Sequence, residues 1–229
     1  MFPLAQHDSA CAIRAILAKT ISDCSRESLI KTTGSLFSRD IALHMQAHPA
    51  VNQREFVEPE EFRFKDDGIF PNSVLPLLLY RQAFTAEAED PASVIEQRFA
   101  ENDWTNSWRN GVYSFAHYHS TTHEALGVYR GSATLRLGGE HGKNVEVHAG
   151  DVIVIPTGVA HRKVESSEDF GVVGAYPDGR EWDLLRGRPG ERAHADQNIA
   201  ALPIPDNDPI YGPEGPLLQI WKVRSAKQK

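Results

Sequence analysis

Cysteine is scarce in this chain of 229 residues, which contains only Cys11 and Cys24. Two cysteines near the start of the chain match neither the spacing of a zinc site nor a disulfide framework. We therefore interpret them as idle or buried thiols in a reducing compartment. The length suits one large domain, or one domain with extensions.

A basic excess and a long hydrophobic run are also missing. The formal net charge is −7, which argues against a nucleic-acid partner, because such partners select for a basic face. The longest apolar run, 74–80, is far too short to cross a bilayer. The N-terminus also lacks the basic and apolar segments of a secretory signal. These absences predict a cytoplasmic protein with no nucleic-acid or membrane partner.

Residues 1–55 differ from the rest of the chain, and two apolar stripes at helical spacing predict short helices there. The stripes contain Ala10, Ile13, Leu17 and Ile21, then Leu36, Ile41 and Met45. Partial disorder is the alternative. A helix-turn-helix is disfavoured because the segment has no basic stripe. We predict an N-terminal extension over 1–55, a barrel domain over 56–185, and a Pro/Gly-rich segment over 186–229 that wraps the barrel, with Trp182 and Trp221 as anchors.

From residue 56 the pattern predicts an all-β domain with a few peripheral helices, mainly N-terminal. Asp90 and Pro91 are a helix-start signal for one helix that ends near Asn102. Residues 104–111 are predicted to form an aromatic loop. Short strands are expected at 75–80 (with Pro76 at its start or at a sheet edge), 111–119, 124–130, 133–138, 144–148, 151–155, 161–166 and 170–176. Closely spaced short strands with turn residues between them indicate a sandwich or barrel.

Three histidines and one carboxylate form a candidate metal site. His117 and His119 are two residues apart on a predicted strand, so their side chains face the same way. Glu124 begins the next strand, and His161 begins another just after a turn in which Gly158 relieves backbone strain. Three imidazoles and one carboxylate suit a divalent ion that keeps open coordination positions.

These residues resemble the two motifs of the cupin superfamily. The first motif, G-x5-H-x-H-x3,4-E-x6-G, is met by Gly111, His117, His119, Glu124 and Gly131. The second, G-x5-P-x-G-x2-H-x3-N, is met by Gly150, Pro156, Gly158 and His161. Its last position is Glu165 instead of Asn, which puts local hydrogen bonding in doubt but not the metal ligands.

The resemblance implies a cupin double-stranded β-helix, or jelly-roll barrel, over roughly 70–176. A wider run, from about 60 to 218, resembles the bacterial YjlB-like cupins. The resemblance implies one divalent metal ion, Fe, Mn, Ni or Zn, held by His117, His119, Glu124 and His161. By analogy with other barrel cupins it also implies a homodimer. A cupin that keeps these residues but works without metal is the alternative.

Residues beside the motifs are candidates for further roles. Strand alternation turns His123 away from the interior, although a longer loop would let it replace Glu124 as a ligand. Tyr113 and Phe115 share the face of His117, so Phe115 is expected in the core and Tyr113 near a substrate. Lys163, expected with Glu165 on the face of His161, is a candidate acid or base. Tyr113 and Lys163 are thus the candidate catalytic residues.

Two functions fit these predictions. The first is a metal-dependent enzyme of the dioxygenase, isomerase or decarboxylase type, acting on a small polar substrate that chelates the metal through oxygen. The second is a non-catalytic cupin that binds or senses a metal or a small molecule. An enzyme requires polar groups near a metal with open positions, whereas a binding module fits a closed metal or an apolar pocket.

Overall fold

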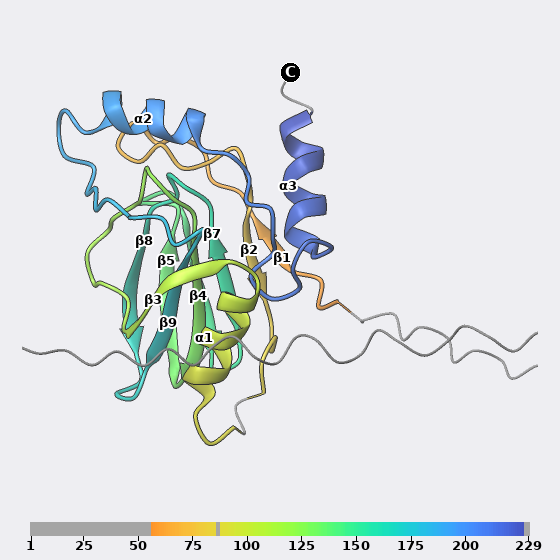
Figure 1. Cartoon of the computed structure of the whole chain (residues 1–229). Coiled ribbons are helices and arrows are strands. Elements are labelled where there is room, and N and C mark those ends of the chain that lie inside the picture. Colours follow the sequence, from red (N-terminus) through yellow and green to blue (C-terminus); the bar gives the residue numbers. More distant parts are fainter. Residues whose placement is uncertain (1–55, 86–87, 227–229) are drawn as a thin grey trace, which may run out of the picture. The chain divides into compact units, whose positions relative to one another are not determined.

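The computed structural model describes residues 56–85 and 88–226, so the helices predicted within 1–55 lie outside the described residues (Figure 1). The strands are β1 (Glu60–Phe62), β2 (Leu77–Tyr80), β3 (Trp104–Asn110), β4 (Glu124–Arg130), β5 (Ser132–Leu137), β6 (Lys143–His148), β7 (Val152–Ile155), β8 (His161–Ser166) and β9 (Gly171–Pro177). The helices are α1 (Pro91–Glu101), α2 (Arg192–Ala201) and α3 (Pro216–Ala226).

The strands form two antiparallel sheets that enclose the main core. The larger sheet has the order β1-β2-β7-β4-β9-β3, and the smaller has the order β6-β5-β8. Apolar side chains from both sheets meet between them, including Leu126, Leu135 and Ile153. The fold is therefore a jelly-roll barrel, as the family resemblance implies.

The outer face of the larger sheet carries a second core. Val152 and Val154 of β7 point outward into it, while the alternate residues of that strand point between the sheets. Helix α1 covers this face, with Ile95 and Phe99 buried (Figure 1). Because both faces of the sheet are covered, its central strands have apolar residues at successive positions.

Helix α1 begins and ends where the sequence predicts. The carboxylate of Asp90 accepts a hydrogen bond from the backbone N–H of Ser93, which satisfies one of the free donors at the helix start. Pro91 occupies the first helical turn, where its missing N–H costs nothing. Asn102 ends the helix.

The predicted strand over 111–119 is wrong, and so is the predicted loop before it. The regular strand is β3, and residues 111–119 form an extended segment with isolated β-bridges at His117 and Tyr118. In β3, a bulge near Asn106, which has a positive φ, turns Trp104 to the outer core and Trp108 to the inner one. The bulge breaks the alternation of polar and apolar residues by which a strand is recognised.

The segment 186–229 contains two helices that the sequence analysis did not predict. Helix α2 buries only Ala195, so it lacks the apolar stripe that reveals a helix. It lies across one end of the barrel (Figure 1). Trp221 of α3 is fully buried, and its indole N–H donates to the carbonyl of Pro76, so the predicted anchor is confirmed. Pro76 stands just before β2, at a strand start rather than at an edge.

A buried carboxylate also ties this segment to the barrel. Asp208 accepts hydrogen bonds from the hydroxyl of Tyr80 (2.6 Å) and from the backbone N–H groups of Ile210 and Leu217. Within 56–85 and 88–226, no helix is long and apolar enough to cross a membrane.

Candidate metal centre

Three buried imidazoles converge at one end of the barrel. One ring nitrogen from each of His117, His119 and His161 lies within 4.8 Å of the others. His117 and His161 are joined by backbone hydrogen bonds in both directions, 2.9 and 3.2 Å long. The extended segment before β4 thus runs beside β8. The period-two spacing of His117 and His119 then puts both rings on the side of His161.

The hydrogen bonds of the imidazoles fix which nitrogen carries the proton. Nδ1 of His117 lies 3.2 Å from the carbonyl oxygen of Phe115, and Nδ1 of His161 lies 3.1 Å from that of Val159. Nδ1 of His119 contacts the carbonyl oxygen of Asp183. A carbonyl oxygen can only accept, so each Nδ1 donates. A neutral ring then presents the lone pair of Nε2, which is the form that binds a metal.

Glu124, the first residue of β4, completes the cluster. Its Oε2 lies 3.2 Å from Nε2 of His161 and 3.6 Å from Nε2 of His119. This oxygen is buried and lacks a hydrogen bond of good geometry from any described residue. Its other oxygen accepts a hydrogen bond from the hydroxyl of Tyr176 (3.1 Å). Buried acceptors that face one another are unfavourable unless a positive charge lies between them, so the donor set fits a divalent cation.

The pKa values also reflect mutual electrostatics within the cluster. Burial, reinforced by His161 and His119, lowers the pKa of His117 to about 2. Burial raises the pKa of Glu124, but the imidazoles of His119 and His161 outweigh it and the net shift is downward. Burial likewise opposes a charged His119, yet the carboxylate of Glu124 raises its pKa. The carboxylate is thus ionised and attracts positive charge into the cluster.

His123 faces away from the cluster, on the side that strand alternation predicts. Its Nδ1 accepts a hydrogen bond from the backbone N–H of Thr157 (3.0 Å), and its Nε2 lies 3.3 Å from the carbonyl oxygen of Pro203. Its ring packs on Trp221. Both nitrogens have backbone partners, so His123 does not replace Glu124, and it is buried rather than on the surface.

Tyr113 and Phe115 lie at the mouth of the site and not inside the barrel. Tyr113 is 48% exposed. Its ring stacks on Phe115 (centroids 4.7 Å apart) and meets His117 edge-on at 5.2 Å. The expectation that Phe115 is core is wrong, because this segment leaves the regular sheet after β3, and between β3 and Phe115 only Val112 is buried.

Lys163 and Glu165 do not share one face, contrary to the sequence prediction. A bulge in the pairing of β8 with β5 separates them: Lys163 pairs with the buried Leu135, whereas Glu165 pairs with Thr134. Lys163 therefore points inward, with its ammonium 6.0 Å from the ring centre of Phe170. Glu165 points outward and accepts a hydrogen bond from the hydroxyl of Thr134. The extra residue of a bulge reverses the side on which later residues fall.

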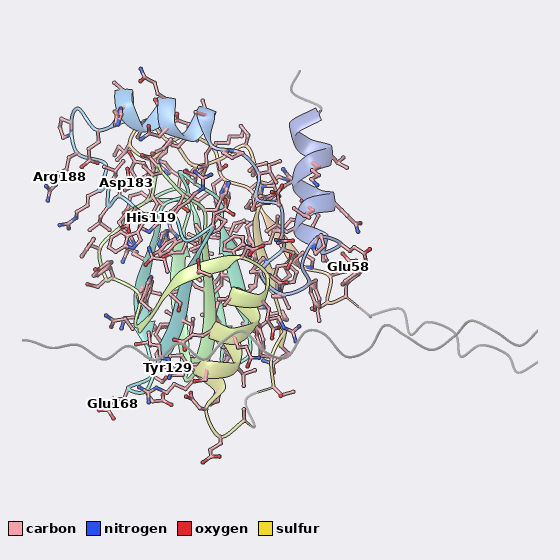
Figure 2. All side chains as sticks on the ribbon, viewed as in Figure 1. Glu58, His119, Tyr129, Glu168, Asp183 and Arg188 are labelled. Carbon is pink, nitrogen blue, oxygen red and sulfur yellow. The ribbon has the colours of Figure 1, made fainter. Side chains whose placement is uncertain are left out.

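A segment that follows β9 supplies contacts that the motifs do not reveal. We call residues 182–187 the strap. Asp183 lies next to His119 (Figure 2), and its carboxylate accepts hydrogen bonds from the backbone N–H and hydroxyl of Ser120. Trp182, predicted as an anchor, is 38% exposed and lies 5.6 Å from the His119 ring. No sequence signal singles out Asp183, because its role depends on how the chain returns over the barrel.

The jelly-roll barrel with this cluster defines the chain as a cupin, and the cupin domain family matches residues 109–170. Over 165 residues the chain is 41% identical to the uncharacterized protein YjlB of Bacillus subtilis (strain 168). The match covers 72% of this chain and 97% of that relative. The chain therefore belongs to the YjlB-like cupins.

Two solved structures resemble this chain more weakly. One is acireductone dioxygenase from Bacillus anthracis with a cadmium ion in its active center, which is 17% identical to this chain, with a TM-score of 0.27. The match covers 41% of this chain and 58% of that one. Procruciferin, an 11S globulin from Brassica napus, is 20% identical, with a TM-score of 0.29; the match covers 34% of this chain and 20% of that one. The chain thus spans only part of either protein, and scores this low say nothing about activity.

Proposed function

We propose that this protein is a metal-dependent enzyme that acts on a small polar substrate through oxygen atoms that chelate the metal. The proposed ligands of one divalent ion, Fe, Mn, Ni or Zn, are His117, His119, His161 and Glu124. The observation that carries the proposal is the buried Oε2 of Glu124, which lacks a well-formed hydrogen bond and faces the Nε2 atoms of His119 and His161.

Such an ion, when bound, supplies Lewis-acid chemistry, or redox chemistry in the case of iron. The protein residues hold and shield the reacting groups. Three backbone carbonyls keep the imidazoles in one tautomer, and Tyr176 orients Glu124. The partly exposed rings of Trp182 and Tyr113 border the site.

The two candidate catalytic residues differ in the support they receive. The phenol of Tyr113 is exposed beside His117, so we propose that it contacts the substrate. Lys163 extends toward Phe170, and we assign it no step. Its role as an acid or base stays a prediction, as do the homodimer and the cytoplasmic location.

Metal content tests the ligand set. Protein purified without added metal is expected to contain close to one divalent ion per chain by elemental analysis. His117→Ala and His161→Ala are each expected to lose that ion, because a site with one ligand fewer and a cavity in its place binds it far more weakly. The matched control is His148→Ala, whose side chain is exposed at the end of β6. Unchanged metal content in both site variants, with normal circular dichroism, would refute the assignment.

A second measurement separates an enzyme from a metal store. An ion with open coordination positions exchanges water, whereas a store fills the coordination sphere with protein ligands. After both proteins are loaded with Mn²⁺ and unbound Mn²⁺ is removed by gel filtration, the wild-type protein is therefore expected to speed the longitudinal relaxation of water protons, and the His117→Ala protein is not. If wild-type Mn²⁺-loaded protein leaves water relaxation at the value of its metal-free form, the protein is a binder and not an enzyme of this type.

A further inference from the structure

The strap runs antiparallel to the segment that carries His117 and His119. Leu185 and Tyr118 exchange backbone hydrogen bonds in both directions, 2.9 and 3.0 Å long. In this register Arg186 stands opposite His117. Side chains of opposed residues project to the same side. Tyr118 and Leu185 pack together in a cluster with Phe70. The next pair, His117 and Arg186, therefore projects to the other side, which is that of the metal centre.

The guanidinium of Arg186 lies at the mouth of the site. Its central carbon is 4.0 Å from the ring centre of Phe115. The Phe115 ring lies 5.6 Å from the ring of His117 and also stacks with Tyr113. A guanidinium held over an aromatic ring keeps N–H groups free for hydrogen bonds. Phe115 thus fixes the charged group of Arg186 close to a proposed metal ligand.

This cation has no carboxylate partner among residues 56–85 and 88–226. Glu191 is near in sequence, but its Oε2 accepts from the backbone N–H groups of Arg186 (2.9 Å) and Arg188 (3.0 Å). By contrast, the guanidinium groups of Arg109 and Arg192 each contact carboxylates. A fixed arginine without an anion beside a metal centre is suited to bind one, because its planar donors match two carboxylate oxygens.

We propose that Arg186 binds a carboxylate of the substrate while other oxygen atoms of the same molecule chelate the metal. The substrate class is thus a small organic acid whose carboxylate is separate from its chelating group. This inference rests on the proposed function, because it takes the metal centre as the other point of attachment. Two carboxylates lie beside the imidazoles. A divalent ion would offset that of Glu124, and that of Asp183 accepts hydrogen bonds from the backbone N–H and hydroxyl of Ser120, so the site accepts an anion.

A pair of probes that differ in one carboxylate tests the inference. 2-Oxoglutarate and 2-oxopentanoate offer the same chelating oxo-acid end, but only 2-oxoglutarate has a distal carboxylate. Their dissociation constants are measured from the visible absorption of the Co²⁺-loaded full chain. Wild-type protein is expected to bind 2-oxoglutarate about tenfold more tightly, the effect of one charge-assisted hydrogen-bonded pair that stays partly exposed. Arg186→Gln is expected to bind the two probes equally.

The matched control is Arg188→Gln, two residues further along and at the outer edge of the molecule (Figure 2). It is expected to keep the wild-type preference, and Arg186→Lys, which keeps the charge but not the planar donors, is expected to keep part of it. Equal binding of both probes by wild-type protein, or a preference that survives in Arg186→Gln, would overturn the role of Arg186 and leave the metal enzyme standing. Failure to bind Co²⁺, or a Co²⁺ spectrum that neither probe changes, would overturn the proposed function itself.

Discussion

His123 and Glu124 are adjacent in the sequence, but their side chains lie on opposite sides of the sheet. Burial lowers the pKa of His123 to about 4, whereas its ordinary value is 6.5. As the pH falls, His123 therefore binds a proton in the unfolded chain at a higher pH than it does in the folded protein. The stability that the neutral ring contributes is complete above pH 6.5 and is lost progressively down to about pH 4.

His123→Gln is expected to remove this pH dependence. Glutamine has an acceptor for the Thr157 N–H and does not titrate, so wild-type stability should fall by up to about 3 kcal/mol more than that of the variant across this range. Urea unfolding of both metal-free proteins at several pH values measures the difference. Equal slopes of stability against pH in the two proteins would show that His123 is not the group responsible.

Tyr176 contacts the proposed metal centre through Glu124. Its hydroxyl donates to one carboxylate oxygen and accepts from the indole N–H of Trp108 (2.8 Å). Tyr176→Phe leaves the carboxylate free to rotate, so metal affinity is expected to fall about tenfold or more, as when other outer partners of metal ligands are removed. Competition with a metal-binding dye measures the affinity. Tyr129→Phe, at the opposite end of the barrel from His119 (Figure 2), is the control and is expected to bind normally.

At the scale of elements, the turn between β7 and β8 sets the position of His161. Gly158 has a φ of +87°, and a Cβ there would clash with the carbonyl oxygen of Asn72. Its N–H donates to the carbonyl of His119 (2.9 Å). Gly158→Ala is therefore expected to destabilise the fold by about 1–3 kcal/mol and to reduce metal content, measured by thermal unfolding and elemental analysis.

Gly111→Ala is the matched control for the turn. A Cβ at Gly111 meets no atom within 4 Å, and its φ lies outside the strained region. The free energy of unfolding of Gly111→Ala is expected to stay within about 1 kcal/mol of that of the wild type. Similar losses in the two variants would mean that the turn has no special requirement for glycine.

The elements that the sequence predicts well are those whose own residues determine them. Helix α1 has its cap and its apolar stripe within eleven residues, and the turns that join the strands from β4 to β8 each contain glycine. The sequence does not predict strand β3 or the side of β8 on which Glu165 lies. In both strands a bulge interrupts the alternation of side chains between the two faces of the sheet. Helices α2 and α3 were missed because they are held by contacts with distant segments, such as that of Trp221 with Pro76.

In the candidate site, too, the sequence predicts some residues and not others. The spacing of His117, His119 and Glu124 and the turn before His161 predict which side chains converge. The groups that hold them are less accessible to sequence reasoning. Asp183 is 64 positions from its partner His119, and its carbonyl reaches Nδ1 only because the strap crosses back over the barrel. A backbone carbonyl leaves no signature in a sequence, since every residue has one.

At the scale of the whole molecule, Asp208 links the C-terminal segment to the barrel. It is fully buried and accepts hydrogen bonds from Tyr80 of β2 and from the N–H of Leu217 in α3. Asp208→Asn replaces an acceptor with a donor and leaves at least one buried N–H unpaired. The free energy of unfolding in urea is expected to fall by about 1–3 kcal/mol. Asp206→Asn, at an exposed position, is the control, and an equal loss there would contradict the assignment.

The paired backbone of Tyr118 and Leu185 has a consequence for hydrogen exchange. The strap contains none of the proposed ligands, yet its amides are bonded to the segment that carries two of them, and the carbonyl of Asp183 accepts from one imidazole. Opening the strap would release that imidazole. An ion bound by these imidazoles would therefore slow amide exchange at Leu185, which is not one of the proposed ligands. The protection of that one amide would report on occupancy of the proposed metal centre.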